Sequence, residues 1–263
     1  MKIALCFHGM SHGKNTLKDC IGSIIKNKDD TVPDTSDSFK KNVININENV
    51  DVFFHTWIND ISKINTIISQ YNPKLYLYEP QKTFNPSYDD ALTLAWYSDF
   101  GAFHKSDQPP IINFPGRYFS KWYSLYTANL LKSTYETMHG FKYDFVIHCR
   151  FDLQFNVPLI FTEYDKTSVY VAKNNHTSYD DNWIFGNSEN MDIIGSLYEN
   201  IYDYLLFYGD TYKKMLYENG MGVPHVGNHD ILTYHIKHNG LKPKIKMMLE
   251  YTKEFSIPKA QKE

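Results

Sequence analysis

Short apolar runs and segments of helical periodicity alternate through the first part of the chain. Residues 2–7 are an apolar run that ends in a glycine-containing loop, which predicts a buried strand. Apolar positions at helical spacing predict a helix over 16–26, and residues 50–55 predict a second strand. Helical spacing returns over 58–68, and 75–78 predicts a third strand. This order of elements is typical of parallel βαβ units.

The middle of the chain contains polar or irregular stretches and one long helix. Residues 27–42 are polar and predict a surface loop, whereas 79–116 contain several prolines and predict an insertion or lid with a short helix at 90–96. The clearest periodicity runs over 120–138, and Gly140 follows it as a helix stop signal.

The second half of the chain continues the alternation and contains no internal repeat or linker. The elements predicted there are strands at 144–149 and 169–172 and helices at 190–217 and 229–238. The last residues carry many lysines and no strong core signal. We therefore predict one α/β domain over 1–245, with a central, mainly parallel sheet flanked by helices, and a C-terminal tail over 246–263.

Composition excludes several classes of protein. The net charge is −3 without a basic block, so no nucleic-acid partner is expected. No apolar run approaches the roughly 20 residues that span a bilayer, and the N-terminus lacks the features of a signal peptide. The 3 cysteines have no zinc-like spacing and favour a reducing compartment. These features predict a cytoplasmic protein, and the excess of Tyr and Phe indicates an AT-rich bacterial or viral genome.

Arginine is rare, and its two positions are therefore informative. Of 27 basic residues only Arg117 and Arg150 are arginine. In a chain that otherwise uses lysine, these positions favour a planar, bidentate cation, in a ligand site or in a structural ion pair. Arg117 begins the long helix, where a helix N-terminus would assist phosphate binding.

A predicted buried strand runs directly into charged residues. Arg150 and Asp152 follow the strand at 144–149, and Phe151 between them is expected to point the other way. Ligands of open α/β sheets bind at the carboxyl ends of strands. An arginine there can bind a phosphate, and a carboxylate can bind Mg²⁺ or Mn²⁺. The alternative is a structural salt bridge between Arg150 and Asp152.

Five segments in order resemble a group of bacterial and large-virus proteins related to glycosyltransferases of the GT-A type. The segments are MKIALCFHG, NVDVFFHTW, RYFSKWYSLYTANLLKSTYE, GFKYDFVIHCRFDL and DDNWIFGNSENMD. The resemblance implies a GT-A-like (Rossmann-like) fold and an enzyme of polysaccharide or surface-glycan assembly. Such an enzyme moves a sugar from a nucleotide diphosphate sugar, here a UDP- or GDP-sugar, to a glycan hydroxyl acceptor.

The resemblance also implies a metal site, and this chain departs from its usual form. GT-A enzymes commonly carry an Asp-x-Asp motif that binds Mn²⁺ or Mg²⁺ and the diphosphate. The corresponding place here holds Arg150-Phe151-Asp152, so an arginine replaces the first carboxylate. Asp152 is the predicted metal ligand, and His225 or His229 could supply a further one.

Other predicted contacts lie at the ends of the first two strands and near residue 180. His8 and Gly9 follow the first strand, and His55 and Thr56 close the second, where the resemblance implies nucleotide contacts. Trp57 fits the core better than the site.

The acceptor side is predicted from a second cluster. Asp180 and Asp181 are candidate general bases for the acceptor hydroxyl, with Trp183 as an aromatic platform beside them. Two adjacent acids in a loop could instead be solvated surface residues.

Rival functions lack their motifs. The sequence has no Gly-x-Ser-x-Gly nucleophile elbow of an α/β-hydrolase and no Gly-x-Gly-x-x-Gly of a dinucleotide-binding dehydrogenase. The remaining alternative is a non-catalytic nucleotide- or sugar-binding protein that retains the GT-A fold.

Overall fold

The computed structural model describes residues 1–9, 34–58, 60–82, 84, 115–173, 178–206 and 228–258, without the side chains of 115–118, 202, 203, 205 and 206. The helices predicted at 16–26 and 90–96 and most of the predicted insertion lie outside these residues.

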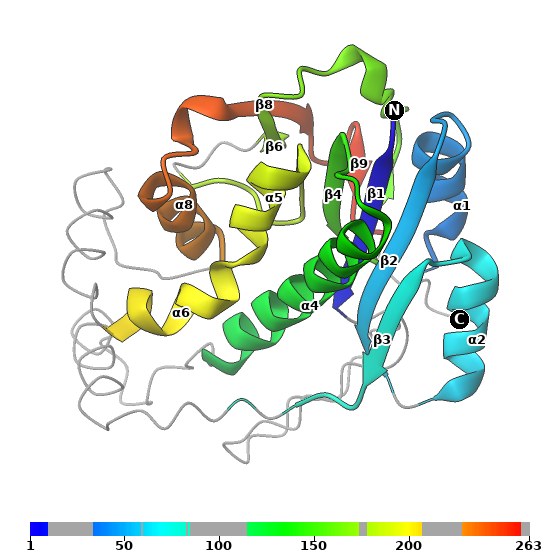
Figure 1. Cartoon of the computed structure of the whole chain (residues 1–263), viewed down its shortest axis with the longest axis horizontal. Coiled ribbons are helices and arrows are strands. Elements are labelled where there is room, and N and C mark those ends of the chain that lie inside the picture. The colour runs from blue at the N-terminus through cyan, green and yellow to red at the C-terminus, as the bar shows by residue number, and fades with distance from the viewer. Residues whose placement is uncertain are drawn as a thin grey trace.

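A mixed, mainly parallel sheet forms the centre of the molecule, as predicted (Figure 1). Its strands are β1 (Ile3–Gly9), β2 (Val50–Trp57), β3 (Leu75–Glu79), β4 (Phe145–Arg150), β6 (Val169–Lys173), β7 (Trp183–Gly186) and β8 (Ile245–Glu250). Their order across the sheet is β3-β2-β1-β4-β7-β6-β8. Strand β7 runs antiparallel to both of its neighbours, whereas the other strand pairs of this sheet are parallel. Two short strands, β5 (Gln154–Phe155) and β9 (Phe255–Ser256), pair separately.

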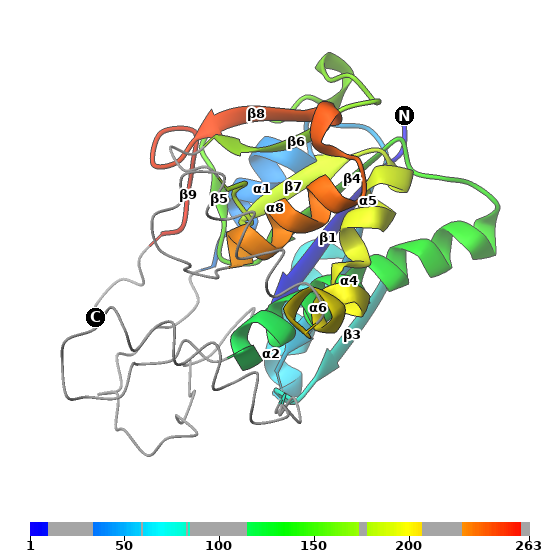
Figure 2. The same ribbon diagram turned by 90° about the vertical axis from the view of Figure 1, so that its left-hand side faces the viewer.

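Helices cover both faces of this sheet. They are α1 (Ser36–Phe39), α2 (Ile61–Tyr71), α4 (Pro115–His139), α5 (Ser188–Gly195), α6 (Leu197–Leu206) and α8 (Asn228–His238), with a π-helical turn at Lys40–Ile44 and 3₁₀ turns at Phe161–Glu163 and Lys242–Lys244. In Figure 2, α4, α5, α6 and α8 lie in front of the sheet, and α1 and α2 lie behind it. The fold is therefore a three-layer α/β arrangement.

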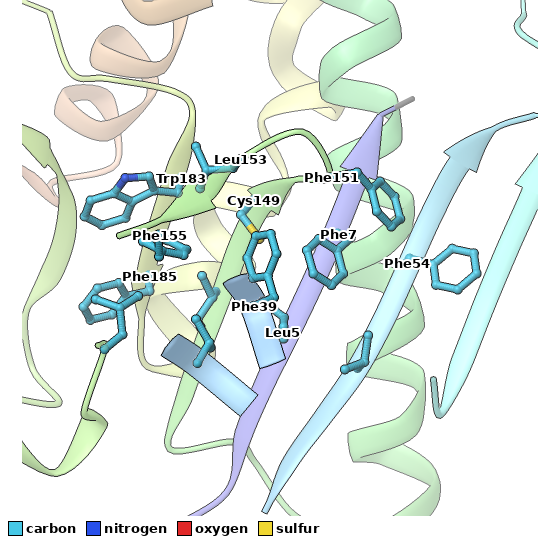
Figure 3. Close-up of a cluster of buried hydrophobic side chains, with 14 of the residues drawn as sticks. Leu5, Phe7, Phe39, Phe54, Cys149, Phe151, Leu153, Phe155, Trp183 and Phe185 are labelled. Atoms are coloured by element: carbon cyan, nitrogen blue, oxygen red, sulfur yellow. The ribbon is translucent and has the colours of Figure 1, made fainter. Parts of the chain in front are cut away.

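Alternation along the buried strands produces two apolar cores, because successive side chains of a strand point to opposite faces. Ala4 and Cys6 of β1 belong to the core under α4, together with Trp122 of that helix. Leu5 and Phe7 belong to the other core, together with the aromatic residues of Figure 3. Continuous apolar runs such as residues 3–7 are what a strand buried on both faces requires.

Helix boundaries follow local capping chemistry. Helix α2 begins after Asp60, whose Oδ1 accepts a hydrogen bond from the Ser62 backbone N–H at 3.0 Å. It ends at Asn72, which adopts a left-handed conformation with φ 44°. Helix α4 ends at His139, and Gly140 follows with φ 67°, which confirms the stop signal in the sequence.

Two segments differ from the prediction. Part of the predicted loop 27–42 is helical, because Phe39 and, one turn later, Val43 are fully buried against the sheet. The predicted tail 246–263 contains β8, which extends the main sheet beside β6. Strand β8 is the last described strand on its side of the sheet and none of its residues is fully buried, so its apolar run is shorter than that of a central strand.

Across the residues described by the structure, none of the helices has both the length and the apolar character that crossing a bilayer requires.

Candidate functional site

The strand order reverses between β1 and β4. From β1 the sheet continues to β2 and β3 on one side, and to β4 on the other. Because these four strands are parallel, their carboxyl ends meet at one edge, and His8 lies opposite Arg150 in the register of β1 and β4. Open α/β sheets bind ligands at such a reversal point.

Strand alternation directs the polar side chains here toward α4. His8 continues the series of Ala4 and Cys6, which face that helix. Arg150 likewise follows Val146, another residue of the α4-side core, at even spacing. Phe151 takes the opposite direction and stacks on Phe7 at a centroid distance of 4.8 Å, as predicted (Figure 3).

The reversed direction of β7 brings the second predicted cluster to the same place. Strand β7 begins at this edge, where Trp183 pairs with Cys149. Asp180 and Asp181 therefore precede β7 beside the end of β4, and both carboxylates act electrostatically on Arg150. Arg150, predicted for the donor, and Asp180 and Asp181, predicted for the acceptor, thus lie together at this edge.

Arg150 and Asp152 form a two-point ion pair. The Arg150 Nε donates to Asp152 Oδ1 at 2.8 Å, and Nη2 donates to Asp152 Oδ2 at 2.5 Å. Burial lowers the pKa of Arg150, but Asp152 outweighs this effect and the net shift is upward. A guanidinium has five N–H groups, so three remain after this pair. The Arg150 side chain is 37% exposed, so these groups can reach a ligand.

A second ion pair stands beside the first, and it includes a residue that the sequence analysis missed. Lys121 of α4 forms an ion pair with the Asp181 carboxylate, and its Nζ donates to the Asp181 carbonyl at 2.9 Å. His229, at the start of α8, places Nδ1 3.0 Å from Asp181 Oδ1. The Lys121 and Asp181 side chains are only 15% and 6% exposed.

The sequence did contain a signal for Lys121. Within the periodic segment 120–138, Lys121 shares the sheet-facing side of the helix with Ser124 and Ala128, at spacings of three and seven residues. A lysine on the buried side of an amphipathic helix requires a partner, and that requirement marks it as a site or network residue.

The electrostatics make Asp181 a poor general base. Burial alone would raise its pKa, but the Lys121 charge and the hydrogen bond from His229 outweigh burial and lower it. A carboxylate with a lowered pKa accepts a proton weakly at neutral pH. Asp180 is also largely buried, and it accepts a hydrogen bond from the Asn182 backbone N–H at 2.8 Å. In the described part of the chain Asp180 has no ion-pair partner, so it fits the role of a base better than Asp181 does.

Predicted residues of β1 and β2 form a buried network beneath the site. The Gly9 backbone N–H donates to Ser124 Oγ at 2.7 Å, and Ser124 Oγ contacts His55 Nδ1 at 2.7 Å. The other ring nitrogen of His55 lies 3.1 Å from Glu79. Burial lowers the pKa of His55 to about 4, so the ring is neutral at pH 7 and bridges Ser124 to Glu79. Gly9 has φ 94°, a conformation that only glycine adopts readily.

This network changes the predicted roles of several residues. His55 and Thr56 are fully buried, and His55 supports the end of β1 through Ser124. His8 is 2% exposed, and burial, assisted by the Lys121 charge, lowers its pKa well below the ordinary value. Trp57 is in the core and stacks on Tyr123, as predicted.

Three further predicted residues are not part of this arrangement. Trp183 is fully buried between Phe155, Phe185 and Phe255, on the sheet face opposite α4, so it offers no platform to an acceptor (Figure 3). The reason is strand parity, because Trp183 and Phe185 share the apolar face of β7. The side chain of Arg117 and all of His225 lie outside the described residues.

The geometry does not fit the divalent-cation site predicted at Asp152 and His229. Within the described ranges, no group of three or more His, Cys, Asp or Glu side chains gathers closely enough to hold a metal ion. Both Asp152 oxygens bind Arg150, and His229 Nδ1 is directed at Asp181. A metal ion at Asp152 would lie against a guanidinium of like charge.

Comparisons with known proteins identify no family. The sequence matches no protein-family model, and no curated protein is significantly similar to it. The crystal structure of mouse xyloside xylosyltransferase 1 in its apo form is similar over 94% of this chain and 84% of that one, with 8% identity and a TM-score of 0.42.

A second solved structure is the glycosyltransferase GlyE of Streptococcus pneumoniae. It is similar over 95% of this chain, with 10% identity and a TM-score of 0.41. This chain spans 46% of that protein, about half its length. At these TM-scores neither likeness carries an argument about activity, which has to come from the site itself.

Proposed function

We propose that this protein is a glycosyltransferase that takes a sugar from a nucleotide diphosphate sugar and passes it to a glycan hydroxyl. The observation that carries the proposal is Arg150 at the reversal point of the sheet, with N–H groups left over from its pair with Asp152. A guanidinium in this position binds phosphate oxygens bidentately. The ordered segments that resemble GT-A proteins favour a nucleotide diphosphate as the ligand.

The residues beside Arg150 supply the remaining chemistry. Transfer with inversion requires a base that takes the proton of the acceptor hydroxyl while the sugar carbon is attacked. Asp180 is assigned this role, since Asp181 is held by Lys121 and His229. Gly9, at the end of β1, lets the backbone approach the nucleotide, and the buried His55 and Ser124 hold it there.

The first test is thermal stabilisation by a panel of UDP-, GDP-, CMP- and dTDP-sugars. A ligand at about 100 times its dissociation constant stabilises the folded state by about 2.7 kcal/mol, which is a clear rise in melting temperature. We expect one nucleotide family to stabilise the protein. The absence of stabilisation by every donor would contradict the proposal.

The second test separates an enzyme from a binding protein that retains the fold. Release of the nucleotide diphosphate is measured with the donor that binds, in the unmodified protein and in Asp180→Asn. We expect turnover to fall by at least about 100-fold in the variant while donor affinity changes little. Donor binding without release, even with a range of glycan acceptors, would instead identify a non-catalytic protein.

A further inference from the structure

The two ion pairs at the reversal point satisfy the carboxylates of Asp152 and Asp181 and leave N–H donors. Asp152 is held by Arg150 at two points, and Asp181 is held by Lys121 and His229. Each of these carboxylates thus already has a cationic partner within the protein. A divalent cation at either carboxylate would have to displace the cationic partner that already holds it.

The uncommitted donors suit an anion. Among the described residues, Arg150 retains three of its five N–H groups after the pair with Asp152, and Lys121 retains one of three after its two bonds to Asp181. The two cations are close enough that the Arg150 charge lowers the pKa of Lys121, although burial is the larger cause of that shift. Asp181 contacts Lys121 directly and precedes β7 beside the end of β4, so it lies near both cations.

The Lys121 side chain is fixed in position, unlike that of a typical surface lysine. Its ammonium is fixed by two atoms of one residue, Asp181, and the stem is largely buried against the sheet. A preorganised cation loses less conformational entropy when a ligand binds. Asp181 is then a positioning residue, which aims Lys121 and does not take part in proton transfer.

We propose that this site binds the diphosphate of its donor on Arg150 and Lys121, without a divalent metal ion. The inference rests on the proposed function, because it concerns how the same site holds the nucleotide diphosphate. It assigns to Lys121 the charge neutralisation that a metal ion supplies in an Asp-x-Asp site. It also explains why an arginine stands in place of the first carboxylate.

The test is calorimetric titration of the unmodified protein with UDP and with GDP, each in excess EDTA and in millimolar Mn²⁺. The nucleotide that binds is expected to bind with the same affinity, within about twofold, in both conditions. Titration with Mn²⁺ alone is expected to give no binding in the micromolar range. Binding that needs Mn²⁺ and disappears in EDTA would overturn the inference and leave the proposed function intact.

Variants then assign the cations. Arg150→Gln and Lys121→Gln are each expected to weaken nucleotide binding in EDTA by roughly tenfold or more, the scale of a lost charge-assisted hydrogen bond. Lys121→Arg keeps the charge and is expected to retain most of the affinity. The control is Lys63→Gln, on the exposed side of α2, which is expected to change nothing.

The remaining outcomes are distinguishable. Metal-independent binding that survives Lys121→Gln would remove Lys121 from the site. The absence of binding by any nucleoside diphosphate, with or without Mn²⁺, would contradict both this inference and the proposed function. The comparison of EDTA with Mn²⁺ uses the unmodified protein, so it does not depend on whether a variant folds.

Discussion

Helix α4 carries two lysines on its sheet-facing side, and their surroundings differ. Lys121 and Lys132 are eleven positions apart (132 minus 121), which is three turns and about 16 Å along the helix. Lys132 is fully buried, and its Nζ contacts Glu136 at 3.1 Å, Asp192 at 2.6 Å and Ser188 at 2.8 Å. Lys121 lies at the edge of the sheet, and the hydrogen-bond acceptors that it contacts among the described residues are two oxygens of Asp181.

The difference lies in the donors that remain. The three N–H groups of Lys132 meet three acceptors, so this network is complete and joins α4 to α5. The Lys121 pair keeps one donor and stands beside Arg150 and its free N–H groups. A complete buried network specifies packing, whereas an incomplete one at a strand edge is available to a ligand. The second half of α4, with Lys132, thus contributes to packing, whereas the first half, with Lys121, contributes to the candidate site.

The largest expected effect comes from opening the complete network. Lys132→Met keeps the apolar stem but leaves Glu136 fully buried, with the half-exposed Lys142 as a remaining cation. We expect the free energy of unfolding to fall by about 3–5 kcal/mol, measured by urea denaturation. The matched control Lys142→Met removes an exposed partner of the same carboxylates and is expected to cost less than about 1 kcal/mol. Similar losses in both variants would contradict the distinction.

Asp181→Asn tests the open pair, with a smaller effect on stability. The variant leaves Lys121 partly buried without its counter-charge, so we expect a loss of about 1–3 kcal/mol at pH 7. Because the pKa of Asp181 is lowered in the folded protein, its stabilisation is complete above the unfolded pKa of about 3.9 and is lost as the pH falls below it. Urea denaturation at pH 7 and at pH 3 should therefore show the difference between the two proteins shrinking. A constant difference would mean that the carboxylate charge is not responsible.

Ser124→Ala tests the hydrogen bonds that lie one turn along α4 from Lys121, on the side of the candidate site. The change leaves the Gly9 N–H and His55 Nδ1 without their partner, and we expect a loss of about 1–2 kcal/mol. Because Gly9 ends β1 at the site, nucleotide affinity should also weaken. The complementary control is Ser133→Ala, whose hydroxyl donates to Asp192 in the other region and which should leave affinity unchanged. Equal nucleotide affinities in the two variants would mean that Gly9 does not contribute to nucleotide binding.

His229→Gln is expected to have the smallest effect on stability. The hydrogen bond with Asp181 raises the pKa of His229, and its side chain is 44% exposed, so solvent screens much of the interaction. A raised histidine pKa stabilises the fold below the unfolded value of about 6.5, and this contribution is lost as the pH rises through the folded pKa. The melting temperatures of the two proteins should differ by one or two degrees (roughly 0.5 kcal/mol) at pH 5.5 and converge by pH 9. A difference in melting temperature that grows with rising pH would contradict a raised pKa of His229 in the folded protein.

Much of the fold could be predicted from local patterns. Apolar runs identified β1, β2 and β4, and periodicity together with Gly140 identified α4 and its end. These signals are strong because a strand buried on both faces and a helix with one buried side constrain every residue in them. Strand β8 was missed, since a solvent-facing edge strand is under no such constraint.

The candidate site was predictable in part for the same reason. Arg150 and Asp152 were identified because they end a strand that is buried on both faces. Trp183 was misplaced, because its side of β7 is decided by pairing with β4 and not by the acids that precede it. The burial of His55 likewise depends on α4, which covers the end of β2 from a distant part of the chain.

By itself the sequence determined the central strands β1, β2 and β4, the long helix α4 and which strand ends in charge, because these follow from the solvation of neighbouring residues. Only the tertiary structure decided that β7 runs against β4, which brings Asp181 to Arg150 and to Lys121 from 60 residues away. Strand order and direction are set by the packing of the whole sheet, and the pairing of charges follows from them. The residues of the site could therefore be identified from their sequence neighbours, whereas the ion-pair partner of each charged residue depends on the tertiary structure.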